Sequence, residues 1–446
     1  MSREESEPET PETPETPEPA SPPVDAGAET PPPSPTPFEP AAPTREGERI
    51  ASIDVVRGFA LGGVLLMNMQ AFAGIFAAYM NPTADGGYHG ASKWLWNVNH
   101  VLADQRFISI FSLLFGAGVL LMTRRLEERT GRSAAVHYRR MLWLGLFGAA
   151  HAYLLWFGDI LLPYAISGLL LWPCRRWRPS ILLLVGTILV VATALLSLGM
   201  DGMLAEAPPE EIAAFEEMWE PDDAQIAETV AAYRGGWLEQ MPERVAQARD
   251  FHAWLPFFVW RLIGLMLIGM ALLKTGFLAA RKAPALYLGI GVVGVVSGAV
   301  VSWLGIEARV ERDWELAYSM GEGSLYNTVG ATLGAFGWLG LILWVCAVGR
   351  WAGVRRRLAA VGRMAFTNYL MQTVICTTLF YGHGLGWYGS VDRPGQLAVF
   401  VVVFGLQLAW SPWWLARFRM GPMEWVWRAL TYLRLPPLRR DAARAE

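Results

Sequence analysis

Long apolar segments recur along this chain from residue 53 to residue 418, and they constrain the fold more than any other feature. Only 17 % of the residues are charged and 53 % are hydrophobic, whereas soluble domains usually have about 25 % charged residues. Ten runs are long enough to cross a membrane as helices: 53–79, 101–123, 140–158, 160–174, 180–200, 254–278, 284–305, 325–348, 362–382 and 396–418. The sequence therefore predicts an all-α, polytopic integral membrane helical bundle with about ten transmembrane helices.

The arginines lie mainly on alternate connections between these runs. Six arginines occur in 124–140, five in 350–363 and seven from residue 417 onward. The other connections hold far fewer, among them three arginines in the long segment 201–253. Because lysine and arginine concentrate in cytoplasmic loops, this asymmetry predicts that both termini are cytoplasmic.

Five regions follow from composition and span order. Residues 1–48, rich in Pro and Glu, predict a disordered acidic cytoplasmic tail. Residues 49–200 form an N-terminal transmembrane half, and residues 254–433 form a C-terminal transmembrane domain. Between them, 201–253 contains thirteen acidic residues and amphipathic stretches, which predict an extracytoplasmic helical loop. Residues 434–446 form a cytoplasmic tail.

Several kinds of site have no support in the sequence. The three cysteines lie in or beside apolar segments without metal-ligand spacing, so neither a disulfide framework nor a metal site is indicated. Walker loops and dinucleotide fingerprints are missing, and the basic clusters lie at span ends. We therefore expect no metal and no nucleic acid, with the lipid bilayer as the first partner. The sequence is compatible with a homodimer.

Asp54 and Arg57 place a charged pair at the start of the first apolar helix. At 100° per residue, Asn68 falls on the same helix face within about 60°. Ionisable groups at membrane depth nearly always face the protein interior, so this face is expected to point into the bundle and line a substrate cavity. The alternative is a charged collar that only orients the first span.

Two further polar pairs are candidates for the same cavity. Asp104 and Arg106 stand at the outer end of the second span, where they could also form an interface collar. Asn368 and Gln372 lie one turn apart in the ninth span. Two amides on one face can bind a substrate, but more commonly they hold helices together.

His151 is the sharpest candidate for a catalytic group, with Asp159 as its partner. Imidazole can take and return a proton near neutral pH without a large change of pKa. If the helix stays regular, Asp159 lies about two turns beyond His151 and displaced by about 80°, so that the two share a cavity without touching. The alternative is a histidine that hydrogen-bonds across helices and an aspartate that caps the hairpin.

Four segments carry a resemblance to a known family. They are SIDVVRGFALGGVLLMN at 52–68, HAYLLWFGDIL at 151–161, GRMAFTNYLMQTVICTTLF at 362–380 and FRMGPMEWVWRALTY at 418–432. Together they resemble the YeiB-like bacterial membrane proteins, whose C-terminal half is a domain of unknown function. The first segment is also similar to transmembrane acyltransferases related to heparan-α-glucosaminide N-acetyltransferase. The resemblance implies a multi-pass protein of the bacterial cytoplasmic (inner) membrane, with an acyltransferase-like N-terminal half at 49–200. Those acyltransferases use a histidine between the first two spans, where this chain has His89 in a different spacing.

The leading functional hypothesis is an acyltransferase that uses cytoplasmic acyl-CoA as co-substrate and an envelope sugar or lipid as acceptor. Arg124, Arg125 and Arg140 would bind the coenzyme phosphates. His151 would act as general base on the acceptor. A solute or proton-coupled transporter that uses the same buried polar residues is the alternative. A membrane scaffold that docks partners through the Pro-rich tail is a third hypothesis, and it leaves the buried charges unexplained.

Overall fold

The computed structural model describes residues 50–440, and these residues form helices joined by turns and loops, with no named strand. The predicted tail at 1–48 lies outside the described residues, as do the last six residues of the predicted C-terminal tail. Residues 434–440 fold back on the end of α19 (Arg393–Arg417), where Arg419 N–H donates to the Leu438 carbonyl at 2.9 Å.

Within residues 50–440, seven helical segments are long and apolar enough to cross a membrane. They are α1 (Ala51–Ala73), α3 with α4 (Gly90–Leu102 and Arg106–Thr130), α8 (Pro179–Ser197), α13 (Leu255–Lys274), α14 (Pro284–Val310), α15 with α16 (Leu316–Met320 and Glu322–Ala347), and α19. The prediction of an all-α helical bundle in a membrane is therefore confirmed.

The other three predicted spans are helical but shorter or interrupted. The run at 140–158 is α5 (Ala134–Ala150) followed by a π-helical turn, η2 (His151–Leu155). The run at 160–174 divides into α6 (Leu161–Leu169) and α7 (Leu171–Cys174). The run at 362–382 is α18 (Ala365–Phe380), which a break at Met364 separates from α17 (Ala352–Arg363). The count of ten spans stays a prediction.

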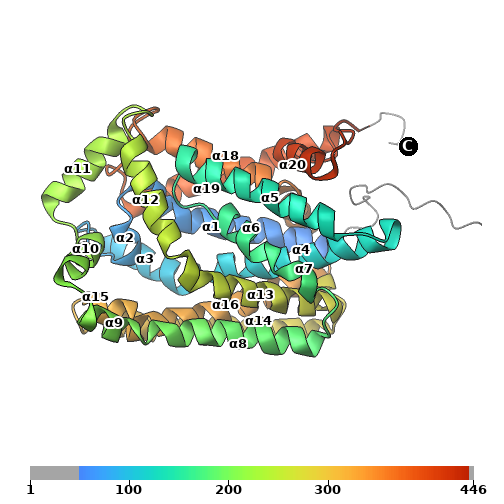
Figure 1. Ribbon diagram of the computed structural model, residues 1–446, viewed down its shortest axis with the longest axis horizontal. Coiled ribbons are helices and arrows are strands. Elements are labelled where there is room, and N and C mark those ends of the chain that lie inside the picture. Colours follow the sequence, from blue (N-terminus) through green and yellow to red (C-terminus); the bar gives the residue numbers. More distant parts are fainter. Residues whose placement is uncertain (1–49, 441–446) are drawn as a thin grey trace, which may run out of the picture. The chain divides into compact units, whose positions relative to one another are not determined.

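The segment 201–253 is helical, as predicted. It contains α9 (Met200–Glu206), α10 (Pro209–Trp219), α11 (Asp223–Arg234) and α12 (Met241–Ala253). In Figure 1, α10 and α11 gather at the left-hand end of the bundle with the short α2 (Ala77–Met80), while α20 (Pro422–Tyr432) lies at the opposite end. The short turn η3 (Phe277–Ala279) joins α13 to α14. Ile50 and Tyr432, near the two ends of the described part of the chain, line one cavity.

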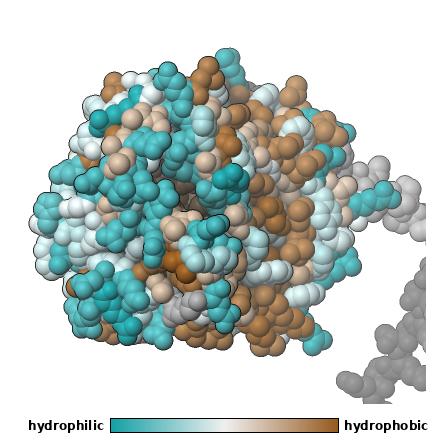
Figure 2. Space-filling model, turned by 60° about the vertical axis from the view of Figure 1, so that its left-hand side comes forward, coloured by the Kyte–Doolittle hydropathy of each residue, from teal (hydrophilic) through white to brown (hydrophobic). Residues whose placement is uncertain are grey.

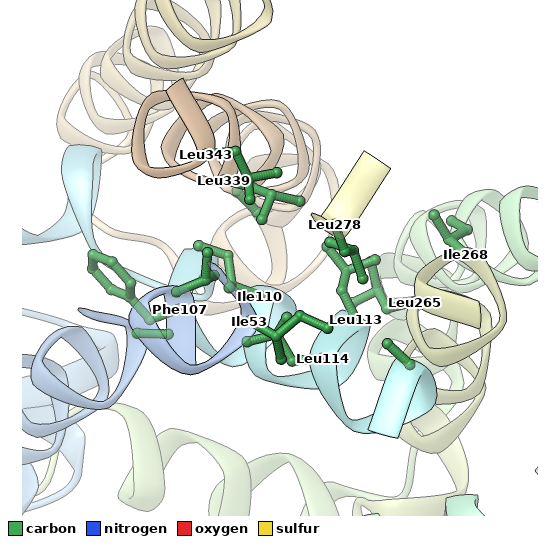
Figure 3. Close-up of a cluster of buried hydrophobic side chains, with 14 of the residues drawn as sticks. Ile53, Phe107, Ile110, Leu113, Leu114, Leu265, Ile268, Leu278, Leu339 and Leu343 are labelled. Atoms are coloured by element: carbon green, nitrogen blue, oxygen red, sulfur yellow. The ribbon is translucent and has the colours of Figure 1, made fainter. Parts of the chain in front are cut away.

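Glycines set how closely the central helices approach. On α14, a Cβ added at Gly294 or Gly298 would meet the backbone of α16 at Gly337, Gly330 or Gly334 within 2.6–2.8 Å. Gly294 and Gly298, one turn apart on α14, therefore allow α14 and α16 to approach closely. The apolar core beside this pair comes from α1, α4, α13 and α16, as Figure 3 shows. Its labelled side chains are Ile53, Phe107, Ile110, Leu113, Leu114, Leu265, Ile268, Leu278, Leu339 and Leu343.

Polar and apolar residues lie on different parts of the surface. Figure 2, turned so that the end with α10 and α11 comes forward, shows hydrophilic residues gathered on that end and apolar residues over the flank beside it. The outward faces of α8 and α14 are apolar, with Leu184 62 % and Val293 67 % exposed. Side chains of this kind suit contact with lipid, as expected for the membrane-facing side of such helices.

Candidate active site

A tight hairpin between α5 and α6 creates a deeply buried polar site. The π-helical turn begins at His151, whose carbonyl accepts the Trp156 N–H at 2.9 Å, and the helix then stops. A Cβ at Gly148 would lie 2.3 Å from the Leu162 nitrogen, and a Cβ at Gly158 would lie 2.2 Å from the Trp156 ring. Only glycine at these two positions lets the chain reverse this closely.

This hairpin brings His151 and Asp159 into direct contact. The Nδ1 of His151 lies 2.9 Å from Oδ1 of Asp159, and both side chains are about 1 % exposed. The other oxygen of Asp159 accepts the Leu162 N–H at 2.7 Å and so caps α6. The sequence expectation that the two residues do not touch was wrong, because it assumed a regular helix where the chain makes a π turn and reverses.

The second ring nitrogen of His151 contacts a third helix. Its Nε2 lies 2.9 Å from the hydroxyl oxygen of Thr373 on α18, which is 1 % exposed. The ring of Tyr369, one turn earlier on α18, lies 5.1 Å from the imidazole. The Tyr369 hydroxyl donates to the Gly158 carbonyl at 3.3 Å. Both nitrogens of the imidazole are thus engaged, one by a carboxyl group and one by a hydroxyl group.

A cavity of about 300 Å³ opens between α1, α4, α5, α17, α18 and α20. From Ile108 to Arg125 it follows α4 for roughly 25 Å, at about 1.5 Å per residue. Apolar side chains such as Leu61, Phe111 and Phe115 line its interior. Tyr369 lines the cavity as well, and its ring lies 5.1 Å from the buried imidazole.

Positive charge dominates one end of this cavity. Five arginines line it against two acidic residues, Asp54 and Glu424; the arginines are Arg57, Arg125, Arg140, Arg363 and Arg428. Asp54 Oδ1 accepts from Arg57 at 2.9 Å, and the guanidinium of Arg140 stacks over the Trp427 ring at 4.2 Å. Among the described residues that line the cavity, arginines thus outnumber carboxyl groups by five to two, and arginine binds phosphate groups through paired N–H donors.

Glu424 ties α20 to the start of α18. Its carboxyl group accepts the backbone N–H groups of Phe366 at 2.8 Å and Thr367 at 3.1 Å, and the Thr367 hydroxyl at 2.5 Å. These are donors of the first helical turn, which lack partners inside the helix. Burial raises the pKa of Glu424, although these hydrogen bonds act in the opposite direction. This contact fixes the cavity wall that α18 and α20 share.

A second polar cluster lies around Asp104, away from the cavity. Its carboxyl group accepts hydrogen bonds from Tyr79 at 2.8 Å and Asn327 at 2.6 Å, and His100 Nδ1 lies 3.2 Å away. Arg106 donates to the Ser302 hydroxyl at 2.7 Å and to backbone carbonyls on α3 and α14. This cluster joins α3 and α4 to α14 and α16, so both predicted residues are buried in a helix junction.

The remaining predicted site residues do not reach the imidazole. Asn368 donates to the Val361 carbonyl at 3.2 Å and to the Ser411 hydroxyl at 3.1 Å, and Gln372 donates to Gln407 at 2.8 Å. Both amides therefore hold α18 against its neighbours α17 and α19. Asn68 is half-buried on α1 and does not line the cavity. His89 lies exposed in a loop, with Nδ1 3.0 Å from the Gly86 carbonyl.

Comparison with known proteins places the chain in a family. It is 33 % identical to the uncharacterized protein YeiB of Escherichia coli (strain K12) over 391 residues, which cover 86 % of this chain and 96 % of that protein. It belongs to the YeiB-like family. It is also 30 % identical over 423 residues to the uncharacterized protein YxaH of Bacillus subtilis (strain 168), covering 89 % and 97 % of the two chains. A family described as a protein of unknown function, DUF418, matches residues 272–434. No solved structure matches the chain.

The family match covers α18, where Thr373 lies, while His151 precedes the DUF418 region. Both YeiB and YxaH are described as uncharacterized, so membership of the YeiB-like family brings no reaction with it. Within residues 50–440 no group of three or more His, Cys, Asp or Glu side chains is placed to hold a metal ion.

Sequence reasoning missed several residues of the site. Thr373 lies 222 residues from His151 along the chain, and no spacing rule connects them. Tyr369 and Glu424 were missed for the same reason, since each acts through a distant helix. Of the three arginines assigned to phosphates, Arg125 and Arg140 line the cavity and Arg124 does not.

The contact between Asp54 and Arg57 predicts energetic coupling. The pair is 2.9 Å apart with side chains 11 % and 27 % exposed, so either charge is poorly solvated when left alone. Asp54→Asn and Arg57→Gln should each destabilise the protein, and the double variant should lose about 1 kcal/mol less than the sum of the two. Chemical unfolding of the four proteins in detergent measures this cycle. Losses that add to within about 0.3 kcal/mol would mean that the pair does not interact.

Proposed function

We propose that this YeiB-like protein is an integral membrane acyltransferase of the bacterial cytoplasmic membrane. It takes an acyl group from cytoplasmic acyl-coenzyme A and transfers it to a hydroxyl or amino group of a sugar or lipid on the opposite face. The observation that supports this most is the cavity, which joins an end rich in arginines to an apolar interior ending at Tyr369 beside His151.

The donor fits the cavity by its chemistry. Coenzyme A carries phosphates at one end and, in its acyl thioester, an apolar chain at the other. Arginine is the side chain best suited to phosphate, through paired N–H donors. The arginine-rich end lies where α1 begins and α4 ends, which the charge asymmetry predicts to be cytoplasmic. A cytoplasmic acyl-coenzyme A would thus enter with its phosphates at the mouth.

The acceptor is activated by His151. Asp159 accepts from Nδ1, which fixes the neutral tautomer with its lone pair on Nε2. An imidazole held in this way can remove a proton from a hydroxyl or amine and return it to the leaving thiolate. The extracytoplasmic side of the site is covered by α12, where Arg244 donates to the Leu154 carbonyl at 2.7 Å. We place the acceptor on this side, beneath α12.

Binding of acyl-coenzyme A tests the proposal. Purified wild-type protein should bind acetyl-, octanoyl- or palmitoyl-coenzyme A in calorimetry. Arg125→Gln and Arg428→Gln should each weaken binding by about 10–100-fold, the effect of losing one charge-assisted hydrogen bond of about 1.5–3 kcal/mol. Arg132→Gln, at an exposed arginine outside the cavity lining, is the matched control and should bind as wild type does.

Absence of binding by folded wild-type protein to all three thioesters would overturn the proposal. If solute or proton flux then appeared in proteoliposomes, the transporter hypothesis would replace it. Equal binding by the wild type and both cavity variants would mean that the phosphates do not occupy this cavity.

A further inference from the structure

His151 lies between a hydroxyl group and a carboxyl group. A nucleophile, a general base and the carboxylate that orients the base have the same order in a catalytic triad. The Thr373 oxygen lies 2.9 Å from Nε2, and Asp159 Oδ1 lies 2.9 Å from Nδ1. All three side chains are about 1 % exposed and come from separate segments, α18, η2 and the hairpin before α6. The same sequence of contacts activates a hydroxyl nucleophile in hydrolases on unrelated folds.

The direction of the hydrogen bonds is fixed by Asp159. One carboxyl oxygen accepts the Leu162 N–H, and the other faces Nδ1, so Nδ1 carries the proton of the neutral ring. Nε2 then has only a lone pair and must accept from Thr373. The Thr373 hydroxyl has no other hydrogen bond among the described residues, so its proton is directed at the imidazole.

We propose that Thr373 is the nucleophile of this protein and carries the acyl group as a covalent ester. This rests on the proposed acyltransferase function. The Thr373 oxygen attacks the thioester carbonyl while its proton moves to Nε2 of His151. The carbon–sulfur bond breaks, and the coenzyme thiolate takes that proton. The acceptor hydroxyl or amine then loses a proton to Nε2 and attacks the ester carbonyl. The bond between the acyl carbon and the Thr373 oxygen breaks, and the proton on Nε2 returns to that oxygen.

The donor needs to pass only one side chain to reach this hydroxyl. Tyr369 lines the cavity, and Thr373 follows it by four residues on α18, which places the two on the same helix face. Rotation of the Tyr369 ring would therefore open the cavity to Thr373. Trp156 adds a further group, because its buried Nε1–H has no hydrogen-bond partner within residues 50–440 and its ring lies 6.3 Å from the imidazole. We assign this N–H to stabilising the oxyanion.

A covalent carrier also solves a problem of access. The coenzyme binds from one side and the acceptor from the other. If the acyl group is first attached to Thr373, the two substrates need not occupy the site at the same time. On the side away from the cavity, His252 of α12 lies near Tyr153 of η2, with 3.4 Å between the ring nitrogen and the phenol oxygen. The acceptor would enter there after the coenzyme has left.

Trapping of the ester tests the assignment. Full-length protein in detergent is incubated with radiolabelled octanoyl-coenzyme A without acceptor, quenched in acid and digested for mass spectrometry. Wild-type protein and Thr373→Ser should carry the label on residue 373, and Thr373→Val and His151→Gln should carry none. Turnover by Thr373→Val should fall by about 10³-fold, whereas Thr373→Ser should stay active. The label should resist neutral hydroxylamine, as an oxygen ester does.

Cys376 on the same helix supplies the control. Cys376→Ser should keep the label and the turnover, because this buried free cysteine makes no hydrogen bond to His151 in the described part of the chain. Label that neutral hydroxylamine removes, or that Cys376→Ser abolishes, would overturn the role of Thr373. Turnover without any label in wild-type protein would overturn the covalent ester and leave the acyltransferase function standing. Absence of both binding and turnover would overturn both.

Discussion

Replacing His151 by glutamine should lower acyl transfer by about 10²–10⁴-fold, the usual effect of removing a positioned acid–base group. The protein should stay folded, because glutamine can still donate to Asp159 and accept from Thr373, the two partners that His151 holds at 2.9 Å. The loss should appear in turnover and leave acyl-coenzyme A binding intact, since the imidazole does not line the cavity. Single-turnover transfer assays, with a thermal melt of each protein, measure it.

His89→Gln is the matched control. The side chain of this exposed histidine has one hydrogen bond among the described residues, with the Gly86 carbonyl, so its replacement should change neither turnover nor melting. Asp159→Asn should behave like His151→Gln, because an amide at that position no longer fixes the imidazole tautomer. If His151 only joined helices, its replacement would lower stability by about 1 kcal/mol and leave turnover per folded molecule intact. That result would remove His151 from the reaction.

Gly362→Ala should destabilise the protein by about 2–3 kcal/mol, in the range of overpacked helix contacts. A Cβ at Gly362 would lie 2.0 Å from the Asp54 carbonyl oxygen, and a Cβ at Gly58 would lie 1.9 Å from the Leu358 carbonyl oxygen. The atoms that the added Cβ would meet belong to the backbone, which cannot rotate away as a side chain would. The helices α1 and α17 must therefore separate. Chemical unfolding in detergent measures the loss. Because the Arg57 guanidinium reaches the Gly362 carbonyl at 3.4 Å, acyl-coenzyme A binding should weaken as well.

Gly353→Ala on the same helix provides the comparison. A Cβ at Gly353 meets nothing within 4 Å, so this change should be neutral or stabilise α17 by up to about 1 kcal/mol through helix propensity. Similar unfolding free energies for the two variants would show that α1 and α17 do not depend on the close contact.

The amides and the buried arginines illustrate how polar groups are used in this bundle. Asn368, Gln372 and Arg106 all lie at membrane depth in the sequence pattern, and all donate to groups on neighbouring helices. In a membrane, apolar helix surfaces gain little free energy by packing against each other instead of against lipid. Such hydrogen bonds and close glycine contacts therefore hold the helices together. These three residues therefore explain how α18 is joined to α19 and how α4 is joined to α14.

The sequence by itself determined the features that depend on local pattern. Apolar length and charge content indicated a helical membrane bundle, and the family could be recognised from four short segments. The contact between Asp54 and Arg57 was foreseeable, because three residues on one helix are neighbours whatever the rest of the chain does. The same holds for Gly294 and Gly298, whose spacing leaves one helix face without side chains.

Only the tertiary structure decided which distant groups meet at the site. Whether His151 touches Asp159 depended on a π turn and on two glycines that let the hairpin close, features that apolar length does not reveal. Thr373 and Tyr369 reach the imidazole because α18 packs against that hairpin. The arginines of five separate helices converge on one cavity, and α20 contributes to it because it folds back beside α5. Such contacts arise from how helices pack against one another. The identity of a residue and its near neighbours does not specify them.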